Sequence, residues 1–323
     1  MTQRELQTPS HHQSPLTLLF IPPRNNSALW LAPLRAAFPF DDFRVFPDVG
    51  DPATIDCALV ADPPRGELAN FPRLRLIQSL WAGVDALLAD PTLPGHIPLA
   101  RLVDPSLTSA MSESVVAHVL SIHRQLHIYR LQQSMRKWQP LPQPHAHERR
   151  VGILGLGALG SAAANKLMVL GFDVAGWSRR PKHIDGMLCF TGQEGLDMLL
   201  SRTDILVCLL PLTPETRDIL NARTLALLPQ GATVINLARG EHISDEDLLD
   251  SLNRGHIAYA ILDTFSIEPL PTEHPYWSHP HINVTPHVAA TTDPRTAIPQ
   301  VVQNIERLRE GLPLIHLVDR VRG

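Results

Sequence analysis

The stretch VGILGLGALG, at residues 151–160, decides the fold class of this chain. Its first four residues are typical of a buried strand, and residues 158–170 follow with helical spacing. Gly155 permits a tight turn, Gly157 lets the backbone approach a pyrophosphate, and Gly160 allows the helix to pack closely on the strand. This strand–turn–helix context predicts a dinucleotide-binding unit, with the phosphates on N–H groups at the helix N-terminus.

Apolar runs and helical segments alternate on both sides of this motif. Strands are expected at 16–21, 57–60, 74–80, 99–103, 151–154, 172–177, 204–210, 233–237, 258–262 and 282–285. Helices are expected at 27–37, 112–138, 158–170, 245–252 and 296–310, with a proline-rich connector at 139–150. Strands that are apolar nearly throughout fit parallel sheets covered on both faces. The alternation predicts βαβ units and a doubly wound α/β fold.

Length and composition exclude several classes of protein. With 323 residues, 44% of them hydrophobic, the chain has material for about two domains, each with a core. The 28 Lys and Arg residues against 32 Asp and Glu give a net charge of −4, which provides no overall basic field for nucleic acid. The longest apolar runs are far shorter than the ~20 residues that a membrane-spanning helix needs.

The N-terminal segment and the cysteines indicate the compartment. Residues 1–14 are polar and rich in Pro and His, so we expect a disordered lead-in and not a signal peptide. Cys57, Cys189 and Cys208 are odd in number and widely spaced, which argues against a disulfide scaffold or a zinc ribbon. These features favour a soluble cytoplasmic protein.

The segment after the strand at 172–177 indicates which dinucleotide binds. An NAD-binding unit carries an acidic residue there, which binds the ribose hydroxyls. This chain has Ser178, Arg179 and Arg180 instead. Guanidinium groups can pair with a 2′-phosphate through two hydrogen bonds, so we expect NADP. The alternative is that both arginines are solvated surface residues.

Three further residues follow predicted strands. Arg239, Glu268 and His287 therefore lie where the carboxyl edge of a parallel sheet places ligands. Arginine suits a two-bond clamp on a carboxylate, and histidine paired with a carboxylate forms an acid–base unit. Spacing alone does not show that the three converge. Taken singly, Arg239 can equally be an ion-pair partner and His287 a loop histidine.

The chain matches one family along nearly its whole length. The matching segments are SLWAGVD at 79–85, WQPLP at 138–142, GLGALG at 155–160, WSRR at 177–180, LPLTPET at 210–216, NLARG at 236–240, LD at 262–263, EPLP at 268–271 and PHVAA at 286–290. In content and order they resemble the D-isomer-specific 2-hydroxyacid dehydrogenases, most closely the glyoxylate/hydroxypyruvate reductase A branch. The resemblance implies hydride transfer from NADPH to glyoxylate and hydroxypyruvate.

The resemblance also implies roles for single residues. Arg239 clamps the substrate, His287 is the acid/base with Glu268 as its carboxylate partner, and backbone N–H groups near Ala82 and Gly83 receive the substrate carboxylate. Asp263 by analogy contacts the nicotinamide carboxamide. The expected cofactor-binding set is Gly155, Gly157, Ala158, Leu159, Gly160, Ser178, Arg179, Arg180, Leu210, Pro211, Leu237, Ala238 and Asp263.

The family's organisation is expected here as well. A Rossmann cofactor domain at 104–287 is inserted in a flavodoxin-like substrate domain made of 1–103 and 288–323, to which the last helix returns. The arm at 112–138 is where the family dimerises, so we expect a homodimer. His118, His123 and His127 share that arm, but with no carboxylate or thiol to complete a ligand set we expect helix-surface histidines and no metal.

The chain departs from the family pattern at two places. Trp81 stands where many members have a small residue, so it either limits substrate size or points into the domain core. Met111-Ser112-Glu113 replaces the Thr-Ala-Glu segment of many relatives, at a nicotinamide contact. Two other functions stay open. One is a dehydrogenase for a bulkier 2-oxo acid, and the other is a non-catalytic NADP-sensing protein like the family's corepressors.

Overall fold

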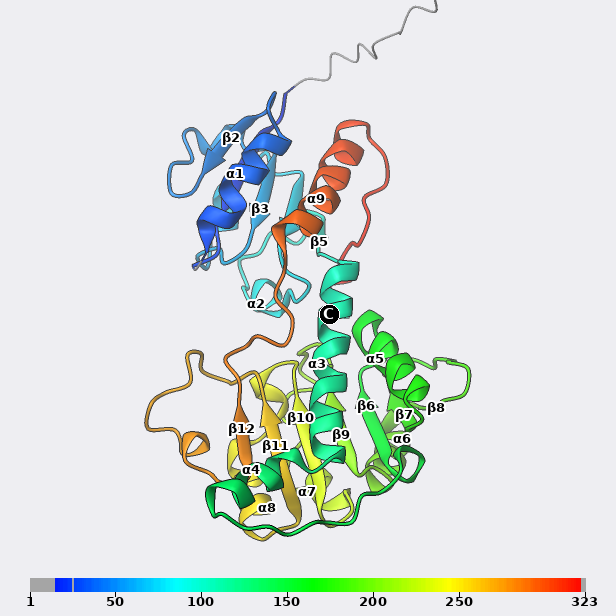
Figure 1. Cartoon of the computed structure of the whole chain (residues 1–323). Coiled ribbons are helices and arrows are strands. Elements are labelled where there is room, and N and C mark those ends of the chain that lie inside the picture. Colours follow the sequence, from blue (N-terminus) through cyan, green and yellow to red (C-terminus); the bar gives the residue numbers. More distant parts are fainter. Residues whose placement is uncertain (1–14, 25, 321–323) are drawn as a thin grey trace, which may run out of the picture. The chain divides into compact units, whose positions relative to one another are not determined.

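The computed structural model describes residues 15–24 and 26–320, and the expected disorder of 1–14 lies outside this range. The chain divides into two compact units (Figure 1). The first consists of residues up to 104 and from 293, and the second is Pro105–Thr292. The second unit thus ends at Thr292, five residues beyond the expected end at 287. The reason is that Ala289 is buried in the core of this unit.

The first unit is built on a five-stranded parallel sheet in the order β2-β1-β3-β4-β5. Its strands are β1 (Thr17–Ile21), β2 (Asp42–Val45), β3 (Cys57–Val60), β4 (Leu76–Ser79) and β5 (Leu99–Ala100). Its helices are α1 (Ser27–Ala37), α2 (Asp85–Leu88) and α9 (Pro294–Arg309). This strand order is that of flavodoxin-like folds.

Alternating residues of β1 separate two cores in this unit. Leu18 and Phe20 face α1 and α9, where they join Leu34 and Val301, whereas Leu19 faces the opposite cluster. A strand buried on both faces explains why its sequence is apolar throughout. The expected return of the last helix is confirmed, because α9 packs against α1.

The second unit is built on a seven-stranded parallel sheet in the order β12-β11-β10-β9-β6-β7-β8. Its strands are β6 (Arg150–Leu154), β7 (Asp173–Trp177), β8 (Leu188–Phe190), β9 (Ile205–Cys208), β10 (Ala232–Asn236), β11 (Ile257–Leu262) and β12 (Ile282–Val284). The order reverses between β6 and β9, which is the Rossmann arrangement. The expected fold class, two doubly wound parallel-sheet domains, is confirmed.

Helices cover both faces of the second sheet (Figure 1). They are α3 (Pro105–His123), α4 (Leu126–Ser134), α5 (Ala158–Val169), α6 (Gly192–Ser201), α7 (Ala222–Leu227) and α8 (Asp245–Asn253). Val115 of α3 and Leu167 of α5 share one core with Ile235 of β10. Its neighbour Val234 faces the other core, against Leu248 of α8.

The expectation of one helix over 112–138 was wrong. The helix starts earlier, at Pro105, where the fixed φ of proline suits the first helical position. It ends at His123, and Gln125 then adopts a left-handed conformation, with φ of 58°, before α4 begins. A residue in that conformation cannot continue a right-handed helix, so the arm is two helices.

Five elements were not expected from the sequence, namely β2, β8, α2, α6 and α7. β2 and β8 are edge strands, and β2 (DFRV) alternates charged with apolar residues. The sequence of α6 contains two glycines, which weaken a helical pattern. Edge position therefore hid β2 and β8, and glycine content hid α6.

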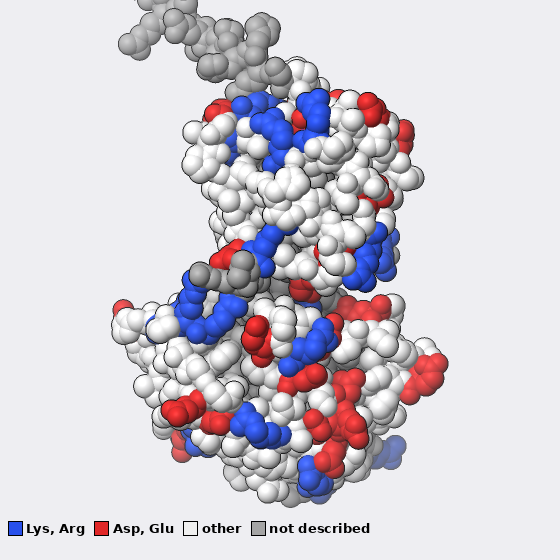
Figure 2. Space-filling model, turned by 180° about the vertical axis from the view of Figure 1, so that it is seen from behind, with Lys and Arg blue, Asp and Glu red and all other residues white. Residues whose placement is uncertain are grey.

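The surface charge and the hydropathy of the helices agree with the small net charge and short apolar runs of the sequence. On the face shown in Figure 2, basic and acidic side chains are interspersed with uncharged surface on each unit. Within residues 15–24 and 26–320, none of the helices has the length and hydropathy to cross a membrane.

Candidate active site

The glycine-rich turn between β6 and α5 has the geometry expected of it. Gly155 has φ of 100° and lies so close to Leu209 that a Cβ there would meet the Leu209 carbonyl oxygen at 2.7 Å. A Cβ on Gly160 would come within 1.8 Å of the Gly155 carbonyl oxygen. Gly157, by contrast, is exposed at the N-terminus of α5, with no atom within 4 Å of its Cβ position. Two glycines therefore allow close packing, and the third leaves room for a ligand.

This turn fits a dinucleotide pyrophosphate. The 12-residue helix α5 offers its first N–H groups and the positive end of its dipole beside the open position at Gly157. Lys182 donates a hydrogen bond to the carbonyl oxygen of Leu156 in the same turn. Sequence reasoning missed Lys182, which adds a positive charge beside the expected phosphates.

The two arginines after β7 are exposed at the end of that strand. Ser178 forms a local turn, in which its hydroxyl donates to the Arg180 carbonyl oxygen at 2.8 Å. Hydrogen bonds with Thr213 and within Glu215 lower the pKa of Glu215, and the Arg179 charge adds to this effect. Arg179 therefore lies near the loop after β9, which borders the same edge of the sheet.

Neighbouring strands β10, β11 and β12 bring Arg239, Glu268 and His287 to one edge of the sheet. Arg239 follows β10, and its loop packs directly on the loop that follows β11. A Cβ on Gly240 would lie 2.0 Å from the carbonyl carbon of Phe265, so only glycine permits this approach. The backbone N–H of Phe265 in turn donates to Oε1 of Glu268 at 3.0 Å.

His287 and Glu268 form a direct pair. Nδ1 of His287 donates to Oε2 of Glu268 at 2.8 Å. This hydrogen bond raises the pKa of His287 above its ordinary value, although partial burial and the nearby charge of Arg239 oppose the shift. Burial raises the pKa of Glu268, but hydrogen bonds from His287 and Phe265 outweigh it, so that pKa is lowered. The pair thus favours imidazolium beside carboxylate.

The backbone of His287 is left-handed, with φ of 54°. This conformation costs roughly 1–3 kcal/mol for a residue other than glycine, and such residues cluster at functional sites. Asp263 holds the turn. Its backbone oxygen accepts from the N–H of His287 at 2.8 Å, and its carboxylate accepts from the N–H groups of Val288 and Ala289, each at 2.9 Å.

These contacts give Asp263 a structural role that was not expected from the sequence. Its side chain is 1% exposed, and Oδ1 also accepts from the Thr285 hydroxyl at 2.6 Å. The carboxylate therefore faces the backbone that carries His287. The expected contact with the nicotinamide carboxamide stays a prediction, and the geometry makes Asp263 an anchor of the His287 turn.

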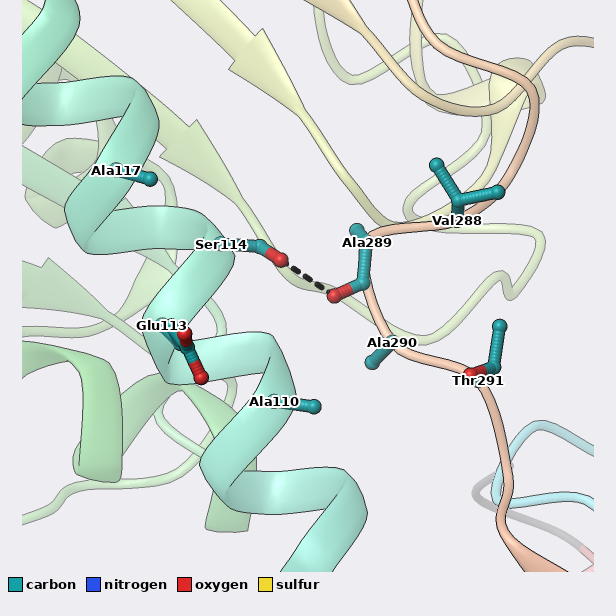
Figure 3. A pocket seen from close by; sticks show the side chains of 8 residues that line it. All are labelled: Ala110, Glu113, Ser114, Ala117, Val288, Ala289, Ala290 and Thr291. Carbon is teal, nitrogen blue, oxygen red and sulfur yellow. Dashed lines mark hydrogen bonds between the residues drawn. The ribbon is translucent and has the colours of Figure 1, made fainter.

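An open hollow of about 340 Å³ lies beside this turn, between α3 and residues 288–291 (Figure 3). The hydroxyl of Ser114 donates to the Ala289 carbonyl oxygen at 2.5 Å and ties the two walls together. The lining residues are Ala110, Glu113, Ser114, Ala117, Val288, Ala289, Ala290 and Thr291. Val288 directly follows His287 in the chain, so one wall of this hollow is built by the segment after the His287–Glu268 pair.

The expected substrate residues lie in the first unit, in the turn after β4. The hydroxyl of Ser79 accepts from the Trp81 N–H at 3.0 Å, and Ala82 and the exposed Gly83 follow. The Trp81 ring is half-buried and meets Trp30 edge-on, with centroids 5.9 Å apart, against the core. This packing supports the core alternative for Trp81.

Other expected cofactor residues differ in exposure. Pro211 is exposed, whereas Leu210, Leu237 and Ala238 are buried. These three side chains pack in the two cores of the second unit, beneath the carboxyl edge of its sheet. Sequence reasoning also missed His242, which is completely buried beside Arg239. A histidine three residues after a candidate arginine was the available signal, but the sequence does not show that it is buried.

The expectation of surface histidines on the arm was wrong for His123. It is 5% exposed, and its ring meets Phe172 edge-on with centroids 5.0 Å apart. His127 is half-buried, with its ring 4.4 Å from that of Tyr259. Burial is the main cause that lowers the pKa of His118, His123 and His127. These histidines belong to the packing of the arm.

Known proteins resemble this chain along most of its length. Residues 116–289 match the family model described as D-isomer specific 2-hydroxyacid dehydrogenase, NAD binding domain. Glyoxylate/hydroxypyruvate reductase A from Yersinia enterocolitica is 44% identical over 314 residues, which cover 95% of this chain and 100% of that protein.

Two crystal structures are similar to this fold. One is a D-isomer specific 2-hydroxyacid dehydrogenase from Xanthobacter autotrophicus in complex with NADPH and MES, with a TM-score of 0.90, 44% identity, and coverage of 96% of this chain and 99% of that one. The other is an NADPH-dependent glyoxylate/hydroxypyruvate reductase from Sinorhizobium meliloti in complex with NADP and sulfate. It has a TM-score of 0.89, 39% identity, and coverage of 94% of this chain and 99% of that one.

The His287–Glu268 pair generates a prediction for the free protein. Glu268→Gln removes the negative charge and the strong acceptor, while burial and the Arg239 charge remain. The pKa of His287 should therefore fall, as followed by NMR titration of its ring protons. His127, whose pKa is lowered by burial and by causes that do not include Glu268, is the internal control and should keep its pKa. An unchanged His287 titration would contradict the assigned pairing.

Proposed function

The chain belongs to the D-isomer-specific 2-hydroxyacid dehydrogenase family, and on that basis we propose that it reduces small 2-oxo acids with NADPH. Glyoxylate would give glycolate, and hydroxypyruvate would give D-glycerate. The observation that carries the proposal is the 2.8 Å hydrogen bond between His287 and Glu268 at the sheet edge that also carries Arg239. The protein is an oxidoreductase, and its similarity to reductases A supports this substrate class.

The mechanism assigns each residue an atom-level task. NADPH, when bound, supplies the hydride that goes to C2 of the oxo acid. Glu268 stabilises the imidazolium of His287 through Nδ1, so the proton for the substrate oxygen comes from Nε2. Arg239 pairs with the substrate carboxylate and polarises the carbonyl, which positions the acid and stabilises developing charge.

The proposed cofactor contacts follow the sheet edge. The pyrophosphate binds the turn at Gly157 and the following residues Ala158 and Leu159, and Arg179 and Arg180 bind the 2′-phosphate. The residues that contact the adenosine side of the cofactor and form the floor of its site are Leu210, Pro211, Leu237 and Ala238. We place the nicotinamide end toward the hollow lined by Glu113 and Val288, because Val288 directly follows His287 in the chain.

A bulkier 2-oxo acid is the second candidate substrate. Trp81 would exclude the bulkier acid only by lining the substrate pocket. Its edge-on contact with Trp30 favours packing in the domain core instead. A substrate panel that includes phenylpyruvate ranks these acids directly. The corepressor-like function predicts binding of NADPH without turnover, which the same assay would detect.

We also propose a cytoplasmic homodimer. Cys57, Cys189 and Cys208 are free thiols, which suits a reducing compartment. The arm at 112–138 exposes large apolar side chains, with Leu131 49% and Trp138 97% exposed. Exposed apolar surface of this kind marks interfaces. A mass near twice 35.8 kDa in solution would support the dimer.

The first functional prediction is NADPH oxidation in the presence of glyoxylate. The unmutated protein should catalyse it, and His287→Ala should reduce kcat by about 10²–10⁴-fold, because general acid catalysis is lost. His183→Ala, at an exposed pair in the same unit, is the matched control and should keep full activity. No turnover of any 2-oxo acid by the unmutated protein would refute the proposed function.

The second functional prediction concerns cofactor choice. One charge-assisted hydrogen bond contributes about 1.5–3 kcal/mol, so Arg179→Ala should lower kcat/KM for NADPH by roughly 10- to 150-fold and leave NADH almost unaffected. Arg223→Ala removes another exposed arginine, which pairs with Asp197 at 3.1 Å, and should change neither value. Equal efficiency of the unmutated enzyme with both cofactors would rule out the preference.

A further inference from the structure

His242 is a buried histidine that the mechanism above does not use. It ends the short segment Gly240–His242, and its side chain is 0% exposed. Its ring lies between the loop after β9 and the loop after β10, both at the carboxyl edge of the second sheet. Burying a polar ring costs free energy unless its nitrogens are hydrogen-bonded, so the partners of this ring indicate its role.

Each ring nitrogen of His242 faces a different loop. Nδ1 lies 3.2 Å from the backbone nitrogen of Arg239 and 3.1 Å from its carbonyl oxygen. Nε2 lies 3.3 Å from the carbonyl oxygen of Pro211. The side chain therefore bridges the residue proposed to bind the substrate and a residue proposed to bind the cofactor.

The bridge holds in both protonation states of the ring. In the neutral ring, Nδ1 accepts from the Arg239 N–H while Nε2–H donates to Pro211. In the imidazolium, Nδ1–H donates to the Arg239 carbonyl oxygen, and the bond to Pro211 is kept. Burial lowers the pKa of His242, but Cys208 and the two carbonyl groups outweigh it and raise the pKa.

Other contacts hold the Arg239 backbone from different sides. Nδ2 of Asn236 donates to the Arg239 carbonyl oxygen at 2.7 Å, and Gly240 packs on the backbone at Phe265. The ring of His242 adds the link to the loop after β9. Together they fix the point from which the Arg239 side chain extends toward the substrate.

We propose that His242 is a positioning residue that couples Arg239 to the cofactor loop at Pro211. The substrate and cofactor roles of the two loops rest on the proposed function, whereas the bridge itself rests on the contacts of the ring. His242 thus positions both loops, with one hydrogen bond on the substrate side and one on the cofactor side.

Two amide variants separate the two halves of the bridge. His242→Asn places an amide where Nδ1 stands and keeps a partner for Arg239, but it is too short to reach Pro211. His242→Gln reaches the position of Nε2 and keeps the bond to Pro211, but loses the partner of Arg239. Each lost hydrogen bond corresponds to roughly a 2- to 13-fold effect, from about 0.5–1.5 kcal/mol.

The kinetic readout is whether each variant affects glyoxylate reduction or NADPH binding. His242→Gln should raise KM for glyoxylate and lower kcat, with the Kd for NADPH unchanged. His242→Asn should weaken NADPH binding and leave the glyoxylate step within about twofold. The matched control is His256→Asn, because His256 also bonds a carbonyl oxygen through Nε2, that of Leu225 at 3.0 Å, away from this edge, and asparagine is too short to keep that bond. It should lower Tm alone.

A second readout does not depend on activity. The Arg239 amide hydrogen should exchange faster with solvent in His242→Gln than in His242→Asn, as measured by NMR on the ligand-free protein. Equal exchange in both variants, or variants that lose Tm without these separate effects on glyoxylate reduction and NADPH binding, would overturn the positioning role. If the unmutated protein fails to reduce glyoxylate, the proposed function falls, and the exchange measurement still decides whether His242 holds Arg239.

Discussion

The parallel register of β10, β11 and β12 is the constraint on which the site depends. Because these strands are neighbours and run in the same direction, the residues that follow them emerge at one edge. Two short contacts then fix the loops to each other. Gly240 brings the Arg239 loop onto the backbone at Phe265, and Asp263 binds the turn that carries His287. The sheet gives the approximate place, and these contacts give the geometry.

Opposing charges set the chemistry at this edge. Glu268 stabilises the imidazolium of His287, whereas Arg239 disfavours it. The balance lies with Glu268, which is bound at 2.8 Å, so the pair is ready to deliver a proton. The same positive charge on Arg239 is suited to a substrate carboxylate. In the proposed function, substrate binding and proton transfer therefore use neighbouring groups at this sheet edge.

Sequence patterns predicted much of this arrangement, and their failures have physical reasons. The glycine-rich turn and the buried strands were predictable because period and residue type reflect local packing. The break at Gln125 was not, because glutamine rarely adopts a left-handed conformation and carries no such signal. Other features depend on segments that are distant in the sequence, and a single sequence does not show which of these segments meet. They are the burial of His123 and His242 and the anchoring role of Asp263.

The central claim is that Glu268 holds His287 as the proton donor of a reductase. The pH dependence of kcat/KM for glyoxylate reduction by NADPH tests it most directly, in the unmutated enzyme and in Glu268→Gln. Reduction needs imidazolium, so activity is present below the raised pKa of His287 and is lost as pH rises through it. The account predicts that this alkaline loss moves to lower pH in Glu268→Gln. An alkaline loss at the same pH in both enzymes would contradict it.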